Sequence, residues 1–499
     1  MELLQTAFLE ILQPLNLLIL AASVIAGVII GAIPGLTVTL AVALAVPLTI
    51  TMTPTAAILM LISLYGAGIY GGSISAVLLN APGTPASAAT SLDGYALGRQ
   101  GKAGKALKMA LFASVYGGVF STVVLILLAP QLASVALRFG PIELSCVLLF
   151  SLTVVGSLSG DSMIKGLLAA ALGMALATIG ADPMTAVPRF TFDTYALFDG
   201  LAYIPLLIGL FALSEMMVQA QTAFVMQGQM VGLGSDPASN RVDRDDWRRS
   251  AVPIIRSGFL GVFVGMLPGL GSSIATFLGY AETRRASREP QRFGKGAIEG
   301  VAASEAANNA VTGSALIPLL ALSIPGDVVT AILLGALLIQ GVTPGPLIFT
   351  TRPDIVTTIY LALFASNLLI LVFGLVAVRP LTRVLAIPKV YLYPVILVMC
   401  VAGSYGIRYS LFDVWVMLGA GVLGYGLRLF GMPVAPLLIA FILTRPFEES
   451  LRQAIVKTEG NLFLFLESPI AVVILVLTVL ALGFTAWRER RPMVSEPRR

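Results

Sequence analysis

Polar residues recur at helical spacing inside an otherwise apolar part of the sequence. Residues 303–314 read ASEAANNAVTGS. Ser304, Asn308 and Thr312 are four residues apart, so they share one face of a helix, and Glu305 lies on the adjoining face. Amide and hydroxyl groups can bind a carboxylate or a sodium ion, and Glu305 supplies a negative charge. The residues expected to bind substrate are Asn308, Asn309, Thr312 and Ser314, and those expected to couple an ion are Ser304, Glu305 and Asn308. The alternative is that these groups only hold helices together.

Four Pro-Gly dipeptides stand inside apolar segments as two matching pairs. Proline removes a backbone hydrogen bond and glycine loosens the backbone, so each dipeptide predicts a break in a helix. Within a membrane, such breaks are tolerated where they line a cavity, and helix N-termini there suit an anion. The alternative is a kink needed only for packing. The further residues expected to bind substrate are Pro34, Gly35, Pro82, Gly83, Thr84, Pro268, Gly269, Pro325 and Gly326, with Ser73 and Asn80 from YGGSISAVLLN (70–80).

The absence of histidine narrows the chemistry. A chain with no histidine has no Ser-His-Asp triad, no His-dependent zinc site and no histidine proton relay. Its two cysteines, Cys146 and Cys400, lie in apolar runs and suggest neither a disulfide framework nor a metal site. We expect no cofactor, no bound metal and no catalytic residue. Any ion coupling must use carboxylates, hydroxyls, amides or backbone carbonyls.

The composition is that of a membrane protein. Of 499 residues, 57% are hydrophobic and 11% charged, against about 25% charged in soluble proteins, and the mean hydropathy is +0.93. A spanning helix needs about 20 apolar residues, and the apolar runs do not alternate as those of a β-barrel do. The sequence predicts an all-α polytopic protein with about 10–12 membrane segments. Two of these are expected near 55–69 and 72–82. The basic residues lie in clusters between apolar runs, so they indicate membrane orientation and not nucleic-acid binding.

The two halves of the chain resemble each other. GAIPGLTVTLAVAL (31–44) and GMLPGLGSSIATFL (265–278) share six of fourteen residues, at an offset of 234 (268 − 34). A second match follows in the same order around Pro82-Gly83 and Pro325-Gly326, at an offset of 243 (325 − 82). Matches in conserved order predict an internal duplication.

Charge indicates how the halves are oriented. The loop after the first motif is uncharged in half one (51–55) and strongly basic in half two (282–295). The loop after the second motif is strongly basic in half one (98–108) and nearly neutral in half two (340–354). Because basic loops stay in the cytoplasm, equivalent loops lie on opposite sides, and the repeats are expected to have inverted topology with broken or re-entrant hairpins.

These features predict a division of the chain. We expect a first membrane repeat at 1–226, a cytoplasmic linker at 227–252, a second repeat at 253–450, and a C-terminal anchor helix with a basic cytoplasmic tail at 451–499. Asp93 follows the first break and is expected in a structural turn, with a helix cap or gating contact as the alternative.

Several long strings resemble the large membrane subunit of the tripartite tricarboxylate transporters. They are GAIPGL (31–36), YGGSISAVLLNAPGTPASAATSLDGYALGRQGKAGKAL (70–107), GMLPGLGSSIATFLGY (265–280), FGKGAIEGVAASEAANNAVTGSALIPLLALSIPGD (293–327) and GVTPGPL (341–347). The resemblance covers about residues 10–485. It implies a bacterial inner-membrane symporter of carboxylates, including citrate and other tri- and dicarboxylates and some aromatic acids, driven by Na⁺ or H⁺. It also implies two partners, a small four-helix membrane subunit and a periplasmic solute-binding protein. One departure is Thr444-Arg445, where leucine-glycine is expected.

The resulting prediction is a subunit of a secondary active carboxylate transporter. The anion is expected between the broken helices near the middle of the bilayer, with one bundle moving in an elevator-like manner. The alternatives are an anion channel and an intramembrane enzyme. The sequence supports neither of them with a motif of its own.

Overall fold

The computed structural model describes the chain except for residues 1, 159–161, 223–230, 233–239, 385–391 and 491–499. The described residues are overwhelmingly helical, and their one sheet is a two-stranded hairpin of β1 (Gly180–Ala181) and β2 (Pro188–Arg189). The predicted all-α class is confirmed. The chain forms two compact units, residues 1–137 with 203–425 and residues 138–202 with 426–499.

Unit 1 contains both copies of the repeated motifs. Its elements are α1 (Glu2–Ile11), α2 (Pro14–Ala32), α3 (Val38–Thr49), α4 (Pro54–Leu79), η1 (Pro85–Ser87), α5 (Ala88–Arg99), α6 (Ala103–Ala136), α9 (Tyr203–Leu207), the π-helix η3 (Ile208–Leu213), α10 (Ser214–Thr222), α11 (Arg244–Met266), α12 (Gly271–Ala286), η4 (Pro290–Arg292), α13 (Ile298–Ser314), α14 (Leu316–Leu322), α15 (Val328–Ile339), α16 (Ile348–Thr351), α17 (Pro353–Val384), α18 (Leu392–Arg408) and most of α19 (Leu411–Leu429).

Unit 2 is smaller and contains the β-hairpin. Its other elements are α7 (Pro141–Leu158), α8 (Met163–Ala177), η2 (Tyr195–Leu197), α20 (Val434–Lys457), η6 (Leu462–Glu467) and α21 (Pro469–Arg490). Arg189 joins the hairpin to α20 through Glu448, with a nitrogen–oxygen distance of 2.8 Å. Asp182 accepts the Thr185 and Met184 backbone N–H groups and pairs with Arg452 at 2.9 Å, which together lower the pKa of its carboxyl. Thr444 and Arg445 lie in the middle of α20.

Seven helices in the described residues are long and apolar enough to cross a membrane, and five shorter apolar helices accompany them. The long ones include α2, α6, α17 and α21. The chain is therefore a multi-pass membrane protein. The predicted break between 69 and 72 is wrong, because α4 runs through Gly71 and Gly72 without interruption. Those glycines instead let neighbouring backbone approach, since a Cβ at Gly71 would lie 2.5 Å from the Val28 carbonyl oxygen.

Each of the four predicted breaks occurs at its Pro-Gly dipeptide. The helices α2, α4, α11 and α14 end two or three residues before the proline concerned. Gly35 and Gly269 both have positive φ, at 90° and 82°. Asn80 and Ser323, which end α4 and α14, are both left-handed at φ 53° and 60° although neither is glycine. The backbone thus adopts matching conformations at matching places in the two halves.

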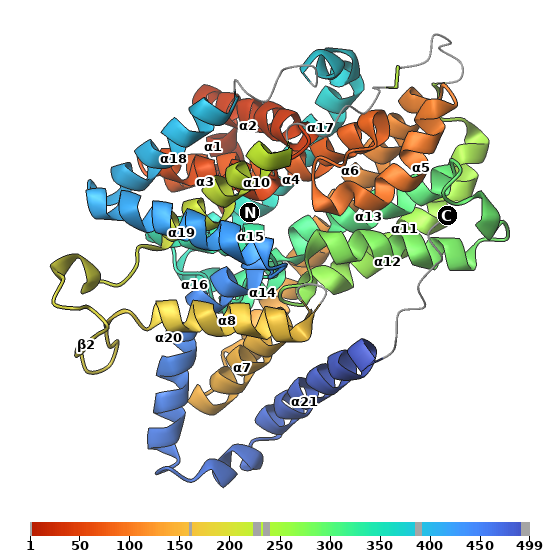
Figure 1. Cartoon of the computed structure of the whole chain (residues 1–499). Coiled ribbons are helices and arrows are strands. Elements are labelled where there is room, and N and C mark those ends of the chain that lie inside the picture. Colours follow the sequence, from red (N-terminus) through yellow and green to blue (C-terminus); the bar gives the residue numbers. More distant parts are fainter. Residues whose placement is uncertain (1, 159–161, 223–230, 233–239, 385–391, 491–499) are drawn as a thin grey trace. The chain divides into compact units, whose positions relative to one another are not determined.

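The halves also pack in matching ways. Helix α2 lies along α4, and α11 lies along α13; Figure 1 shows α11, α12 and α13 side by side. Each half has one long helix that packs on a buried helix of the other half: α6 packs on α13, and α17 packs on α4. At the ends of the bundle, the Gln100 Nε2 amide donates to the Lys295 carbonyl at 2.8 Å, and the Gln340 Nε2 amide donates to the Thr49 carbonyl at 2.6 Å. The two basic loops therefore meet each other, as do the two weakly charged loops.

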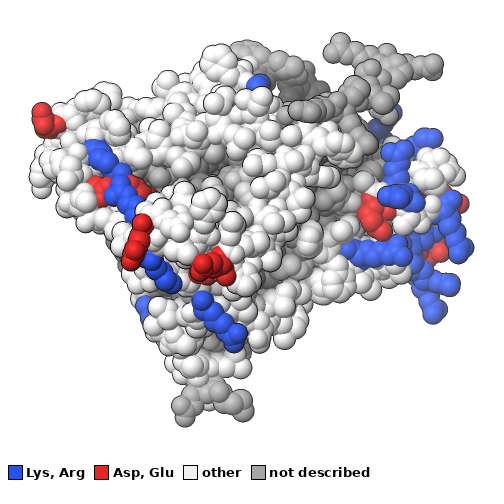
Figure 2. Space-filling view, turned by 90° about the horizontal axis from the view of Figure 1, so that it is seen from below, with Lys and Arg blue, Asp and Glu red and all other residues white. Residues whose placement is uncertain are grey.

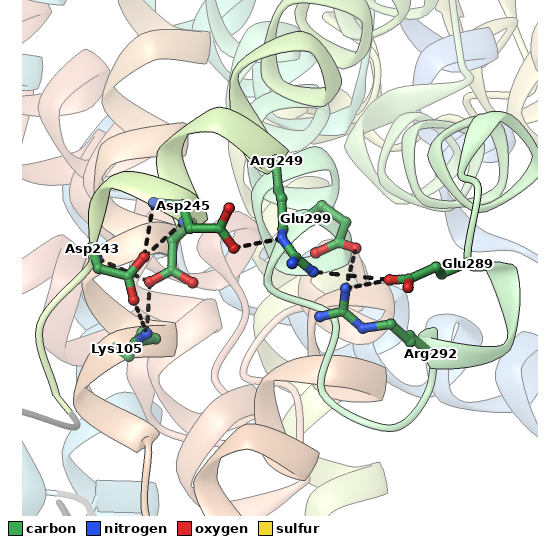
Figure 3. Close-up of polar contacts among 8 residues, drawn as sticks. Lys105, Asp243, Asp245, Arg249, Glu289, Arg292 and Glu299 are labelled. Carbon is green, nitrogen blue, oxygen red and sulfur yellow. Dashed lines mark hydrogen bonds and ion pairs between the residues drawn. The ribbon is translucent and has the colours of Figure 1, made fainter.

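Basic side chains crowd one edge of the face drawn in Figure 2, whereas most of the remaining face is uncharged. Ion pairs join the basic loops to the start of α11 (Figure 3). Lys105 pairs with Asp246 at 2.7 Å and with Asp243 at 3.0 Å. The Asp246 backbone N–H and then Lys105 lower the pKa of Asp243 to about 2. Helix α11 thus begins at Arg244, inside the predicted linker, with Asp243 as its N-cap in a reciprocal capping box.

Asp93 of α5 forms hydrogen bonds to α12 and to the start of α13 in the same region. It lies inside α5, so the predicted turn is wrong, and it is fully buried. Its Oδ1 accepts the Gly296 and Ala297 N–H groups, both at 2.8 Å, and its Oδ2 accepts the Tyr280 hydroxyl at 2.9 Å. Asp93 therefore caps the start of α13 from another helix, which a turn of its own chain would not do.

Removing this cap is expected to destabilise the protein. Asp93→Ala leaves the part-buried Gly296 N–H and the buried Ala297 N–H without their acceptor and should lower the free energy of unfolding by roughly 3 kcal/mol. Asp93→Asn is the matched control, because one oxygen can still accept both N–H groups and the amide can donate to Tyr280. Thermal unfolding in detergent measures the difference. Equal melting temperatures for the two variants would contradict the capping role.

Candidate functional site

Helix α13 is the most completely enclosed segment of unit 1. All of its residues are buried, and it packs against α5, α6, α11 and α12. Small residues allow this close contact: a Cβ at Gly117 of α6 would lie 2.4 Å from the Ala306 carbonyl oxygen, and one at Gly261 of α11 would lie 2.3 Å from that of Ala307. The polar face of 303–314 therefore faces protein on all sides and not lipid.

Glu305 lies at the middle of this helix, and its carboxylate is held by neutral donors from three helices. Its Oε1 accepts the Thr90 hydroxyl of α5 at 2.5 Å. Its Oε2 accepts the Ser114 hydroxyl of α6 at 3.0 Å and the Asn309 amide at 3.4 Å. No Lys or Arg in the described part of the chain forms an ion pair with it. A buried carboxylate without a cationic partner is suited to receive a proton or a small cation.

Asn308 and Ser304 lie one turn apart and are both fully buried. In the described structure, neither the Oδ1 nor the Nδ2 of Asn308 has a hydrogen-bond partner, and the same holds for the Ser304 hydroxyl. A buried polar group without a partner costs about 1–3 kcal/mol. Such a cost is typically tolerated where the group serves a ligand. These three atoms are the strongest structural sign of a binding position in unit 1.

The other polar residues of α13 are already satisfied by their own helix. The Thr312 hydroxyl donates to the Asn309 carbonyl at 2.7 Å, and the Ser314 hydroxyl donates to the Ala310 carbonyl at 2.8 Å. Asn309 donates to the Glu305 carbonyl and carboxylate. The structure therefore separates Asn308 and Ser304, whose side-chain polar atoms have no partner, from Asn309, Thr312 and Ser314, whose side chains donate within their own helix.

The first break is folded tightly against its own helix. Ser73 donates to the Tyr70 carbonyl at 2.7 Å, and the hydroxyls of Thr84 and Ser87 lie 2.8 Å apart. A Cβ at Gly72 would lie 2.3 Å from the Ser87 hydroxyl, so glycine is needed there. Asn80 is exposed at the left-handed end of α4. The segment after Pro82 reaches α13, because η1 contacts both α12 and α13.

The second break is tied to both halves. The Gly269 N–H donates to the Gly326 carbonyl at 2.8 Å, so Pro268-Gly269 and Pro325-Gly326 lie together as expected. Asp327 caps α15 by accepting the Thr330 N–H at 2.8 Å. Its Oδ2 also accepts the hydroxyl of Tyr65 on α4 at 2.6 Å. This hydrogen bond joins the break in the second half to helix α4 of the first half.

Glycine is required where the breaks meet the preceding helices. A Cβ at Gly83 would lie 1.9 Å from the Gly31 carbonyl oxygen, and one at Gly326 would lie 2.7 Å from that of Gly265. We expect Gly83→Ala and Gly326→Ala to destabilise the protein by about 1–3 kcal/mol each, because backbone must move to admit the methyl group. Gly66→Ala in α4 is the control, since its nearest neighbour would be 3.8 Å away. Thermal unfolding distinguishes them, and an unchanged melting temperature for both test variants would contradict this packing.

Sequence reasoning missed four residues of this region, Thr90, Ser114, Tyr65 and Asp327. Asp327 carries a local signal, because Asp followed three residues later by Thr330 is an N-cap pattern. Thr90 and Ser114 carry none, since single hydroxyls are common in membrane helices and only the fold brings them to Glu305. Among the described residues, no group of three or more Cys, Asp and Glu side chains is arranged to hold a metal ion.

Comparisons with known proteins bear on the family to which the chain belongs. The model of the tripartite tricarboxylate transporter TctA family matches residues 17–439. An uncharacterized 52.8 kDa protein of the TAR-I ttuC' 3' region of Agrobacterium vitis is 37% identical over 423 residues, which is 85% of this chain and 83% of that protein. A protein of the TAR-II ttuC' 3' region of the same organism is 39% identical over 215 residues, 43% of this chain and 89% of that protein. No solved structure gives a significant match. Since the family model and the first of these relatives each cover most of the chain, the protein belongs to the tripartite tricarboxylate transporter TctA family.

Proposed function

We propose that this subunit imports a carboxylate by symport with Na⁺ or H⁺, with the anion bound at Asn308 and the coupling ion at Glu305. The observation that carries the proposal is the pair of unpartnered, fully buried side chains Ser304 and Asn308 beside a carboxylate held only by neutral donors. An amide can donate to a carboxylate of the substrate, and a carboxylate can hold the coupling cation or proton. The family points to a tricarboxylate such as citrate, with dicarboxylates and aromatic acids as further substrates.

We also propose that the two halves are inverted repeats. Support comes from the matching left-handed residues at Asn80 and Ser323 and from the crossed packing of α6 and α17. Further support comes from the ends, where the basic loops of the two halves meet each other. If basic loops mark the cytoplasm, Gln100 and Lys295 lie on the cytoplasmic side and Gln340 and Thr49 on the opposite side. Labelling single cysteines at these two ends from outside the cell tests the orientation.

The partners and membrane follow from the same family. We propose a complex with a small four-helix membrane subunit and a periplasmic solute-binding protein in a bacterial inner membrane, in contact with lipid and without nucleic acid. The seven long apolar helices and the tripartite family support it. Copurification from a strain expressing all three subunits tests the assembly.

Uptake into proteoliposomes tests the transport proposal. The chain is reconstituted with its two proposed partners, and radiolabelled citrate is followed with and without an inward Na⁺ gradient. Accumulation above the external concentration supports symport and distinguishes it from an anion channel or an intramembrane enzyme. Uptake under a proton gradient alone would assign H⁺ as the coupling ion. No accumulation of citrate or other carboxylates under either gradient would contradict the proposal.

Alternating access by an elevator-like shift of the broken hairpins is the proposed movement. It rests on the two breaks, which contact both halves through the Tyr65–Asp327 hydrogen bond and the packing of η1 on α13, and so can move together as a body. Cross-links that prevent a shift of the hairpin bundle should stop transport. Full transport by such cross-linked protein would contradict this movement.

A further inference from the structure

Unit 1 contains a polar cavity at its basic end. The cavity has a volume of about 430 Å³ and is lined mainly by α5, the start of α6 and the loop before α13. Its lining residues include Gln100, Lys102, Lys105, Gln291, Arg292 and Lys295. Four cationic side chains thus face this space together with a single acidic one, Asp246.

Two of these cations are unpaired. Lys105 pairs with Asp246 and Asp243, and Arg292 pairs with Glu289 at 2.8 Å (Figure 3). In the part of the chain that the structure describes, no ion-pair partner contacts the ammonium group of Lys102 or Lys295. The cavity therefore presents two uncompensated positive charges, and Gln100 and Gln291 add amides beside them.

The equivalent place in the other half shows that this cavity is not a by-product of the duplicated fold. Gln340 ends α15 as Gln100 ends α5, and each donates its side-chain amide to a loop of the opposite half. The cavity beside Gln340 has a volume of about 20 Å³ and is otherwise lined by apolar residues, among them Leu61, Leu337 and Ile359. Of these two cavities in the described residues, the one at the basic end is the larger and the charged one.

The cavity also lies between α5 and α13, the two helices that contribute Thr90 and Glu305 to the buried polar residues. Leu97 of α5 and Ile298 of α13 form part of its lining. Seven residues along α13 from Ile298 is Glu305, about 10 Å at the rise of an α-helix. Thr90 of α5 meets Glu305 there. Between the cavity and Glu305, Asp93 joins α5 to the start of α13 through its hydrogen bonds to Gly296 and Ala297.

We propose that this cavity binds a small multivalent oxyanion, with Lys102 and Lys295 as its main contacts. Charge-assisted hydrogen bonds from two ammonium groups suit an anion with several carboxylate or phosphate oxygens. The volume of the cavity suits an anion of the size of citrate. We assign the cavity as a release site for the transported carboxylate, and this assignment rests on the proposed function. A phospholipid headgroup offers the same chemistry, because basic clusters at a membrane surface attract anionic lipids.

Binding is measured on the purified full-length protein in detergent, without transport. Trp247 reports on the cavity, because it directly follows the lining residue Asp246; its ring lies tilted against that of Phe112, with the centroids 5.3 Å apart. The other two tryptophans, Trp415 and Trp487, are replaced by phenylalanine. Citrate, inorganic phosphate and nanodiscs with or without phosphatidylglycerol are the probes. Saturable binding of citrate with competition by phosphate is expected, and Lys102→Gln with Lys295→Gln should weaken it about tenfold or more.

Two control variants make the result specific. Arg285→Gln removes an exposed charge from the same basic loop without touching the cavity, and it should leave the dissociation constant within about twofold. Asn308→Ala should keep this binding even where it abolishes uptake, which separates failure of this site from failure of the transport site. Lysine-dependent binding only with phosphatidylglycerol supports the site and assigns a lipid headgroup. Equal binding by the double lysine variant and the parent, or no binding of any probe, would overturn the proposal.

Discussion

Asn308→Ala is expected to abolish carboxylate uptake while the protein remains folded. The amide of Asn308 makes no hydrogen bond within the described structure, so its removal breaks none. It does remove the donor proposed to bind the substrate, and loss of a hydrogen bond to a charged group costs about 1.5–3 kcal/mol. Uptake should therefore fall roughly 10- to 150-fold at equal amounts of protein in the membrane. Truncation leaves a cavity but also removes two buried polar atoms that have no partner, and because these effects oppose each other the melting temperature in detergent should change little.

A second buried asparagine provides the matched control. Asn367 of α17 donates to the Leu363 carbonyl at 2.8 Å, and its side chain lies where a Cβ on Gly118 would be. Asn367→Ala should lower the melting temperature, because it breaks this bond and leaves a cavity, yet uptake per folded molecule should be retained. The two variants thus have opposite expected effects on stability and on transport. If Asn308→Ala transported normally, the anion site would have to lie elsewhere.

The contrast between these asparagines explains what the sequence could predict. Periodicity was enough to identify a polar face on 303–314, and the Pro-Gly dipeptides were enough to locate all four helix breaks. Both are local properties, since proline and glycine act on their own backbone. Which polar residues keep free atoms is not local. The spacing places Thr312 and Asn308 on one helix face. The Thr312 hydroxyl donates to a carbonyl of its own helix, whereas the Asn308 amide has no hydrogen-bond partner in the described structure.

The errors have the same origin. The turn expected at Asp93 is a helix, because its carboxylate caps α13 from a helix more than 200 residues away in sequence. The break expected before Gly72 does not occur, because the glycines of α4 serve close packing against α2. In both cases a residue type that usually marks a turn has a role in contacts between helices. Such contacts depend on the fold of both halves together.

Glu305→Gln is expected to uncouple carboxylate transport from the cation gradient. Glutamine has nearly the same shape, and its Oε1 can still accept the Thr90 hydroxyl while its Nε2 donates to the oxygen of the Ser114 hydroxyl, so the fold should be retained. It carries no charge and cannot take up a proton or balance a cation. The accumulation of carboxylate should therefore no longer depend on the Na⁺ or H⁺ gradient, whereas exchange of labelled for unlabelled substrate across the membrane should continue. Thr90→Val is the companion variant, because it keeps the charge and removes one donor, and it should weaken the gradient dependence without abolishing it. Unchanged gradient dependence in Glu305→Gln would assign the coupling ion to another site, and loss of both accumulation and exchange would make Glu305 part of the substrate site itself.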